Sequence, residues 1–205
     1  MMFFLYYITW ILYKFTSVLL FRIKIIGREN LPKDEGFIMA SNHKAYYDPP
    51  LVGSCFFRQI YYFAKSTLFN NIILGTYLRI VNTIPVKRGT IDRTAMEMAV
   101  KAVHSGFPLL LFPEGTRSLT EDFLKPKPGI GMIVLQAKCD LVPVYIHNSN
   151  RLLDCFLWKR RLYVIFGNPL SKEWLNSLEM TKENYILIAG KVMDEIEKLK
   201  KSHFG

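Results

Sequence analysis

Short apolar runs alternate with segments of helical periodicity along residues 22–205. The short runs, each bounded by turn residues, predict strands over residues 22–26, 37–40, 60–64, 109–112, 141–146 and 162–166. The longer segments predict helices from Asp48 onward, over residues 68–81, after Thr90, over residues 130–138 and after Thr181. Because strands and helices alternate, we expect an α/β fold in which helices flank a mixed or largely parallel sheet.

Two of the predicted helices have an apolar face at helical spacing, and a threonine before each is the expected cap. After Thr90, this face consists of Ile91, Ala95, Met98, Ala99 and Ala102. After Thr181, it consists of Tyr185, Ile188, Ala189, Val192, Ile196 and Leu199. Asp48 precedes two prolines, so we expect it to cap a third helix.

The first 21 residues are almost entirely apolar, and Lys14 is the one charged residue among them. A segment that spans a bilayer needs about 20 apolar residues, and this run reaches that length only when Lys14 is counted. Aromatic residues with polar tips, which favour the headgroup region, occur at Tyr6, Tyr7, Trp10 and Tyr13. We therefore predict a membrane-anchoring, monotopic helix over residues 1–21, with a single N-terminal span as the alternative.

The protein carries 27 lysine and arginine residues against 17 aspartate and glutamate residues, and 50% of the chain is hydrophobic. The apolar content excludes a disordered chain, and the net charge of +10 favours a polyanionic partner. Because the basic residues are dispersed and no nucleic-acid motif occurs, we expect an anionic membrane surface and not nucleic acid. Arg22, Lys24 and Arg28 directly follow the apolar segment, which predicts that the remaining chain lies on the cytoplasmic face of the cell membrane.

A histidine and a carboxylate occur five positions apart, at His43 and Asp48. The loop between them can bring the carboxylate to one ring nitrogen of the histidine. Such a hydrogen bond fixes the tautomer and leaves the second nitrogen free to accept a proton. From the spacing alone, an equally good interpretation makes Asp48 a helix cap and His43 a polar loop residue.

Residues 112–118 read Phe-Pro-Glu-Gly-Thr-Arg-Ser and follow an apolar strand. Backbone N–H groups near Gly115 and the guanidinium of Arg117 suit a phosphate. Glu114 cannot bind an anion, so it should either hold a substrate hydroxyl or brace the loop. The alternative is a charged turn with an internal Glu–Arg pair. Two further cations lie in turns, where a lone charge is usually solvated: Arg88 and Lys127.

Other chemistries lack the motifs they need. The chain has no Gly-x-Ser-x-Gly, no complete dinucleotide-binding glycine pattern and no phosphate-binding loop. The remaining histidines, at positions 104, 147 and 203, show no metal-binding spacing, so we expect no metal and no cofactor. Three cysteines without metal-type spacing are typical of a reduced compartment.

The two motifs together resemble those of the glycerophospholipid acyltransferases, in particular 1-acyl-glycerol-3-phosphate acyltransferases. The similarity extends from about Gly27 to Val144 and includes four sequence blocks in the order of the family. The resemblance implies that His43 deprotonates the acceptor hydroxyl and that Asp48 orients the imidazole of His43. It also implies that the acceptor is bound by Arg88, Glu114, Gly115, Thr116, Arg117 and Lys127. The chain departs from the common pattern at Ala45, where many members have serine, and at Lys87.

The resemblance implies that residues 22–205 form an acyltransferase domain, which follows the membrane anchor predicted over residues 1–21. The implied reaction moves a fatty acyl chain from acyl-CoA or acyl-carrier protein to the free hydroxyl of 1-acyl-glycerol-3-phosphate. The product is phosphatidic acid, an intermediate of phospholipid biosynthesis. Two alternatives stay open: another acceptor, glycerol-3-phosphate or a different lysophospholipid, and a non-catalytic membrane protein that binds anionic lipids.

Overall fold

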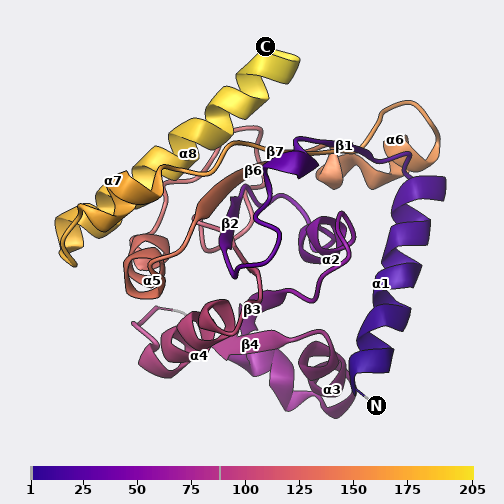
Figure 1. Cartoon of the computed structure of the whole chain (residues 1–205). Coiled ribbons are helices and arrows are strands. Elements are labelled where there is room, and N and C mark those ends of the chain that lie inside the picture. Colours follow the sequence, from indigo (N-terminus) through magenta and orange to yellow (C-terminus); the bar gives the residue numbers. More distant parts are fainter. Residues whose placement is uncertain (1, 88) are drawn as a thin grey trace.

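A computed structural model describes residues 2–87 and 89–205, and for residues 2 and 3 it gives the backbone alone. Seven strands form one sheet with helices on both faces (Figure 1). The strands are β1 (Lys24–Ile26), β2 (Ile38–Ser41), β3 (Tyr61–Lys65), β4 (Thr83–Val86), β5 (Leu109–Leu111), β6 (Leu141–His147) and β7 (Tyr163–Phe166). The α-helices are α1 (Met2–Leu19), α2 (Asp48–Gly53), α3 (Ile72–Ile80), α4 (Arg93–His104), α5 (Gly129–Ala137), α6 (Leu152–Phe156), α7 (Lys172–Asn176) and α8 (Lys182–Phe204). Short 3-10 helices are η1 (Arg28–Asn30), η2 (Ser66–Asn70) and η3 (Ser149–Arg151).

The sheet has the strand order β1-β7-β6-β2-β5-β3-β4. Strands β2 to β6 pair in parallel, β7 pairs antiparallel with β6, and β1 pairs in parallel with β7. The protein is thus a mixed α/β fold with a helix-flanked sheet, as predicted. The parallel part places the carboxyl ends of β2, β5, β3 and β4 at one edge, where loops between strands and helices gather.

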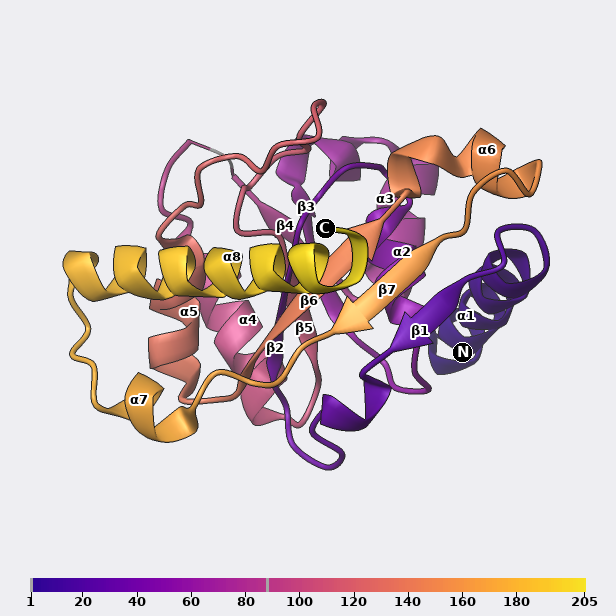
Figure 2. The same ribbon diagram turned by 90° about the horizontal axis from the view of Figure 1, so that it is seen from above.

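Alternate residues of the central strands enter two separate cores, because successive side chains of a strand point to opposite faces. Ile38 and Ala40 of β2 join the core under α4, α5 and α8. Phe37 and Met39 join the core on the other face, which includes Leu51 of α2. Figure 2 shows α4, α5 and α8 on one side of the sheet and α2 and α1 on the other. Strands buried on both faces explain why the sequence shows continuous apolar runs.

Helix α4 begins later than the sequence predicts. The cap is not Thr90 but Asp92, whose side chain accepts hydrogen bonds from the backbone N–H groups of Lys87 (2.9 Å) and Ala95 (3.1 Å). These bonds also lower the pKa of Asp92. The buried face is therefore rotated from the predicted one and consists of Ala95, Met96, Ala99, Ala102 and Val103, while Ile91 and Met98 are exposed.

The predicted helix over residues 68–81 is interrupted at Asn71. The side chain of Asn71 accepts a hydrogen bond from the backbone N–H of Leu74 (2.9 Å), which caps α3 and ends η2 before it. Asparagine at a cap competes with helix continuation by bonding to the nearby backbone. The cap at Thr181 is confirmed, since its hydroxyl accepts from the N–H of Asn184 (3.3 Å).

Helix α1 packs one face against α2 and α3, through the polar tips of its aromatic residues. The indole N–H of Trp10 donates to the carbonyl groups of Gly53 (3.1 Å) and Phe56 (3.0 Å). The Tyr6 hydroxyl accepts from the N–H of Ile60 (3.0 Å). The prediction that the polar ends of Trp10 and Tyr6 lie in the headgroup region of the membrane is therefore wrong, because both groups bind the protein backbone. Within residues 2–87 and 89–205, no helix is both long and apolar enough to cross a membrane.

Gly131 lets α5 and α8 approach closely, and this contact is testable. A Cβ atom at this position would lie 2.4 Å from the backbone oxygen of Tyr185 on α8. We expect Gly131→Ala to lower the free energy of unfolding by about 1–3 kcal/mol, because α8 must move away. The matched control is Gly190→Ala on α8, where an added methyl meets nothing within 4 Å. That variant should be stabilised by about 0.5–1 kcal/mol in urea unfolding. Equal stabilities of the two variants would contradict the role of Gly131.

Candidate active site

The two sequence motifs meet at the carboxyl ends of β2 and β5, which are neighbours in the sheet. The chain leaves β2 at Ser41 and reaches His43 in the following loop. It leaves β5 at Leu111 and reaches Glu114 in the same way. Because β2 and β5 pair in parallel, the two motifs are neighbours in space although they lie far apart in the sequence.

His43 and Asp48 form the hydrogen-bonded pair that the spacing allowed. The Nδ1 atom of His43 lies 2.8 Å from Oδ2 of Asp48, whose side chain is fully buried. The same oxygen accepts hydrogen bonds from the backbone N–H groups of Lys44 (2.7 Å) and Ala45 (2.8 Å). Asp48 lies in the first turn of α2, but its carboxylate faces the preceding loop and does not cap the helix. Asp48 thus shapes the loop and orients the imidazole through one oxygen.

Two neighbours hold the histidine from other sides. The imidazole stacks on the ring of Phe112, with a centroid distance of 3.9 Å and an angle of 19°. Asn42 exchanges two hydrogen bonds with the backbone of Ile146 on β6, at 3.0 and 2.7 Å. The side chain of His43 keeps 14% of its surface exposed. With Nδ1 bound to Asp48, Nε2 is the ring nitrogen left for a reacting group.

Glu114 joins three segments of the site. It is buried, and its Oε1 accepts from the backbone N–H of His43 (2.9 Å) while Oε2 accepts from that of Leu124 (2.8 Å). A third bond, from the N–H of Ser118 to the His43 carbonyl (2.8 Å), closes the same contact. Of the two roles that the sequence left open for Glu114, these contacts support the bracing of the loop. Substrate binding through its carboxylate stays a prediction.

Gly115 and Lys127 are brought together by the loop after β5. Gly115 has a φ of +69°, a conformation that favours glycine, and a Cβ there would lie 2.9 Å from Nζ of Lys127. The backbone N–H of Lys127 donates to the carbonyl of Pro113 (2.8 Å). The N–H of Gly115 donates to the carbonyl of Phe112 (2.9 Å), so it closes the turn. The ammonium of Lys127 is the cation that lies over this turn.

Arg117 contacts the loop of residues 43–48, which we call the motif loop. Its guanidinium carbon lies 3.5 Å from the ring centroid of Tyr46, one of the residues between His43 and Asp48. Thr116 is exposed beside it. Of the remaining predicted residues, Arg88 lies outside the part of the chain that the structure describes. The predicted anion-binding residues that are described therefore flank the His–Asp pair on the β5 side.

No sequence motif assigns a role to Lys44, which links the motif loop to a distant segment. Its ammonium donates to the carbonyl of Thr120 and lies 4.0 Å from the carboxylate of Glu121. Burial lowers the pKa of Lys44. Nothing in the local pattern could identify this contact, because its partners lie more than 70 positions away. The stacking of Phe112 on His43 is equally hidden in the sequence.

Two hollows border the motif loop. A groove of about 600 Å³ has Lys44 and Arg117 among its lining residues and extends to Leu152 and Leu153 of α6. A second cavity of about 190 Å³ lies between α1, α2, β3 and α3, with a mostly apolar lining that includes Trp10, Tyr77 and Leu78. The two hollows share a wall formed by Tyr13, Tyr46 and Pro50. Apolar space therefore reaches the motif loop from two directions.

The model of a protein family described as Acyltransferase matches residues 22–147, which include both motifs. The chain belongs to this acyltransferase family. It is 31% identical over 149 residues to the 1-acyl-sn-glycerol-3-phosphate acyltransferase of Bacillus subtilis, covering 72% of this chain and 73% of that protein. The protein of the same name from Borreliella burgdorferi is 30% identical over 191 residues, covering 90% of this chain and 76% of the relative.

A solved structure shares the fold. It is the 1-acyl-sn-glycerophosphate (LPA) acyltransferase PlsC from Thermotoga maritima, with a TM-score of 0.73 and 24% identity. The superposition covers 95% of this chain and 79% of that one. The predicted acyltransferase class is thus confirmed by the family, and the α/β architecture by the structural likeness.

The bracing role of Glu114 can be measured as stability of the acyltransferase domain. In Glu114→Gln, an amide N–H₂ faces one of the two buried backbone donors, which then lacks an acceptor. We expect the free energy of unfolding to fall by about 1–3 kcal/mol. The matched control is Glu97→Gln on the exposed side of α4, which should change it by less than about 0.5 kcal/mol. Unfolding curves of Glu114→Gln that coincide with those of the unaltered protein would contradict this role.

Proposed function

We propose that this protein transfers a fatty acyl chain from a thioester to the free hydroxyl of 1-acyl-glycerol-3-phosphate and so forms phosphatidic acid. The observation that carries the proposal is the hydrogen-bonded His43–Asp48 pair, whose loop is contacted by Arg117 and lies next to the turn of Gly115 and Lys127. The names of the relatives from B. subtilis and B. burgdorferi support the choice of acceptor. The donor is proposed to be acyl-CoA or acyl-carrier protein.

In this mechanism His43 acts as the general base. Its Nε2 takes the proton from the acceptor hydroxyl while Nδ1–H donates to Asp48. The alkoxide oxygen attacks the thioester carbonyl, the carbon–sulfur bond breaks, and the leaving thiolate takes the proton back from the imidazolium. The buried carboxylate of Asp48 stabilises the imidazolium that exists between these steps. The protein needs neither a covalent acyl-enzyme nor a metal for this sequence.

Arg117 and Lys127 are proposed to bind the phosphate of the acceptor, with Arg88 as a further candidate. A guanidinium binds two phosphate oxygens in parallel, and an ammonium adds a point charge. The stacking of Arg117 on Tyr46 ties this anion site to the loop that carries His43. Phosphate binding would then place the hydroxyl at a fixed distance from the base, which is the main benefit of positioning in catalysis.

The two hollows favour an acceptor that carries an acyl chain. The groove leads from Arg117 toward the apolar side chains of Leu152 and Leu153, which suits one chain beside a phosphate. The apolar cavity behind Tyr46 suits the chain of the donor. Glycerol-3-phosphate, the other acceptor considered, has no chain to occupy the groove. The shape of the site therefore supports a lysophospholipid.

Helix α1 is proposed to lie in the membrane interface, where the lipid acceptor resides. Its outer face carries exposed apolar side chains: Phe4, Ile8, Ile11, Leu12, Phe15, Val18 and Leu19. A continuous apolar face of this kind is rare on a protein surface in water and typical of contact with lipid. We place the bound protein on the cytoplasmic face, because basic residues follow the helix at Arg22 and Lys24.

Replacing the base tests the mechanism. We expect His43→Ala to lower kcat for acyl transfer to 1-acyl-glycerol-3-phosphate by about 10²–10⁴-fold. Binding to lipid vesicles should be unchanged, and the control His203→Ala, at the exposed end of α8, should keep full activity. Unaltered transfer by His43→Ala would exclude this residue as the base. Absence of transfer by the unaltered protein with either donor would favour the non-catalytic lipid-binding protein.

Replacing Arg117 tests the acceptor. We expect Arg117→Gln to reduce the preference for 1-acyl-glycerol-3-phosphate over the phosphate-free 1-acylglycerol by roughly 10–100-fold in kcat/KM, because a charge-assisted bidentate contact is lost. The control Arg28→Gln lies in η1, away from the site, and should keep the preference. An equal fall in kcat/KM for both acceptors would show that Arg117 supports the loop and does not select phosphate.

A further inference from the structure

A second apolar surface lies far from α1 in the sequence, in α6 and the turn that follows it. Leu153, Phe156, Leu157 and Trp158 each have at least 50% of their surface exposed. Three consecutive cations come next, at Lys159, Arg160 and Arg161, and all three are exposed. We call residues 153–161 the α6 patch. The acyl-transfer mechanism uses none of its exposed aromatic side chains.

The backbone holds these side chains outward by its own hydrogen bonds. Cys155 is the buried residue of α6 and fixes the short helix to the protein. The N–H of Trp158 donates to the carbonyl of Cys155 (3.1 Å), and the N–H of Lys159 to that of Asp154 (2.9 Å). Trp158 itself has a φ of +62°, which costs about 1–2 kcal/mol for a residue other than glycine. The fold thus maintains a strained turn whose indole ring remains largely exposed.

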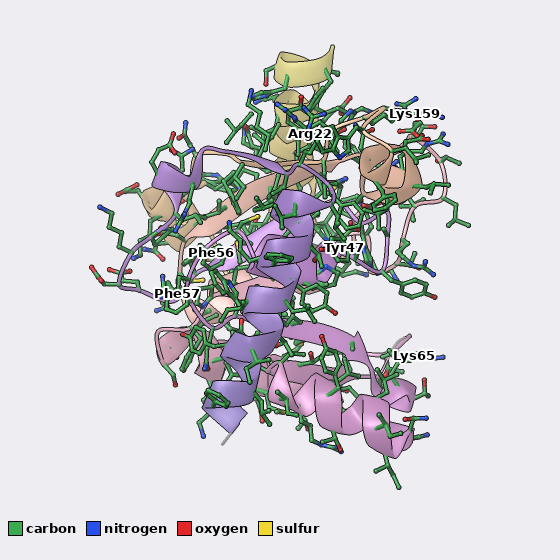
Figure 3. The ribbon with its side chains drawn as sticks, turned by 90° about the vertical axis from the view of Figure 1, so that its right-hand side faces the viewer. Arg22, Tyr47, Phe56, Phe57, Lys65 and Lys159 are labelled. Atoms are coloured by element: carbon green, nitrogen blue, oxygen red, sulfur yellow. The ribbon has the colours of Figure 1, made fainter. Side chains whose placement is uncertain are left out.

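The α6 patch lies next to the C-terminal end of α1 (Figure 1). The guanidinium of Arg22, which follows α1, lies 4.9 Å from the ring centroid of Trp158. Figure 3 views the side of the molecule that carries α1 and shows Arg22 and Lys159 together with Tyr47 of the motif loop. Two apolar segments more than 130 positions apart therefore border the same side of the molecule as the catalytic loop.

We propose that the α6 patch is a second membrane-binding element that inserts Phe156, Leu157 and Trp158 into an anionic bilayer. Apolar side chains beside clustered cations match a surface in which acyl chains lie directly beneath phosphates. One acidic residue occurs in the patch, Asp154, and it pairs with Arg160 at 3.4 Å. A protein partner would have to supply both an apolar pocket and acidic groups, whereas a bilayer supplies both everywhere. This proposal rests on the lipid substrate of the proposed function.

Two points of attachment would also orient the active site. Contact through α1 alone leaves the domain free to rotate about that helix, and contact through α6 removes this freedom. Leu152 and Leu153 line the groove that reaches Arg117, so the groove would open at the membrane surface. A lysophospholipid could then reach His43 without carrying its chain through water.

The first experiment measures binding of the whole protein to vesicles of phosphatidylcholine and phosphatidylglycerol by co-sedimentation. We expect Phe156→Ala/Trp158→Ala to weaken binding by about tenfold or more, since two exposed apolar side chains are removed. The matched control is Ile186→Ala/Leu187→Ala on α8, where the two side chains are 51% and 49% exposed. This control pair should bind as the unaltered protein does. Thermal unfolding of both double variants checks that the fold is kept.

The charged part of the patch is tested separately. Lys159→Ala/Arg161→Ala should lose about fivefold per cation in affinity for vesicles with phosphatidylglycerol. The same variant should bind pure phosphatidylcholine vesicles as before. Brominated lipids should quench the tryptophan fluorescence of the unaltered protein more than that of Trp158→Phe. The reason is that Trp158 of the vesicle-bound protein lies in the bilayer, close to the bromine atoms.

Unchanged vesicle affinity of Phe156→Ala/Trp158→Ala, together with equal quenching of both proteins, would overturn the proposal. An acyl-transfer assay with a short-chain acceptor below its micellar concentration separates this failure from failure of the proposed function. Phe156→Ala/Trp158→Ala should match the unaltered protein there and fall behind it only with acceptor embedded in vesicles. Equal rates of the two proteins on vesicles would also contradict the α6 patch as a membrane element.

Discussion

The hydrogen bond between His43 and Asp48 is the interaction on which the rest of the site depends. A buried carboxylate is costly unless it is hydrogen-bonded, and all the hydrogen bonds to Asp48 among the described residues fall on Oδ2, which accepts from the imidazole and from two backbone N–H groups, while Oδ1 has no partner. The loop has this shape because those three donors converge on one atom. The same bond leaves Nε2 as the basic nitrogen, so a single constraint sets both the loop conformation and the chemistry.

A second buried carboxylate connects this pair to the loop after β5. Glu114 accepts from the backbone of His43 on one side and of Leu124 on the other, so it fixes the loop after β5 against the loop after β2. Lys127 and Arg117 are carried by that assembly, and Arg117 returns to the ring of Tyr46. His43, Arg117 and Lys127 thus lie on loops that backbone hydrogen bonds fix at the edge of a buried parallel sheet.

The sequence predicts the features that depend on local pattern or on short spacing. The strands other than β4, the cap at Thr181 and the His43–Asp48 contact are of this kind. Predictions from the sequence fail where the partner of a side chain lies far away along the chain. Trp10 binds carbonyl groups at the end of α2, and Lys44 binds the carbonyl of Thr120. No periodicity encodes such long-range hydrogen bonds, and the short helix α6 is likewise too brief to leave a pattern.

The orientation of the imidazole can be observed directly by ¹⁵N NMR of the histidine side chains at neutral pH. The signal of His43 is assigned by its absence in His43→Gln. The geometry requires a proton on Nδ1, hydrogen-bonded to Asp48, and the proposed role as general base requires an unprotonated Nε2. A neutral ring protonated at Nε2 would contradict the central claim, because His43 could then not accept the proton of the acceptor hydroxyl.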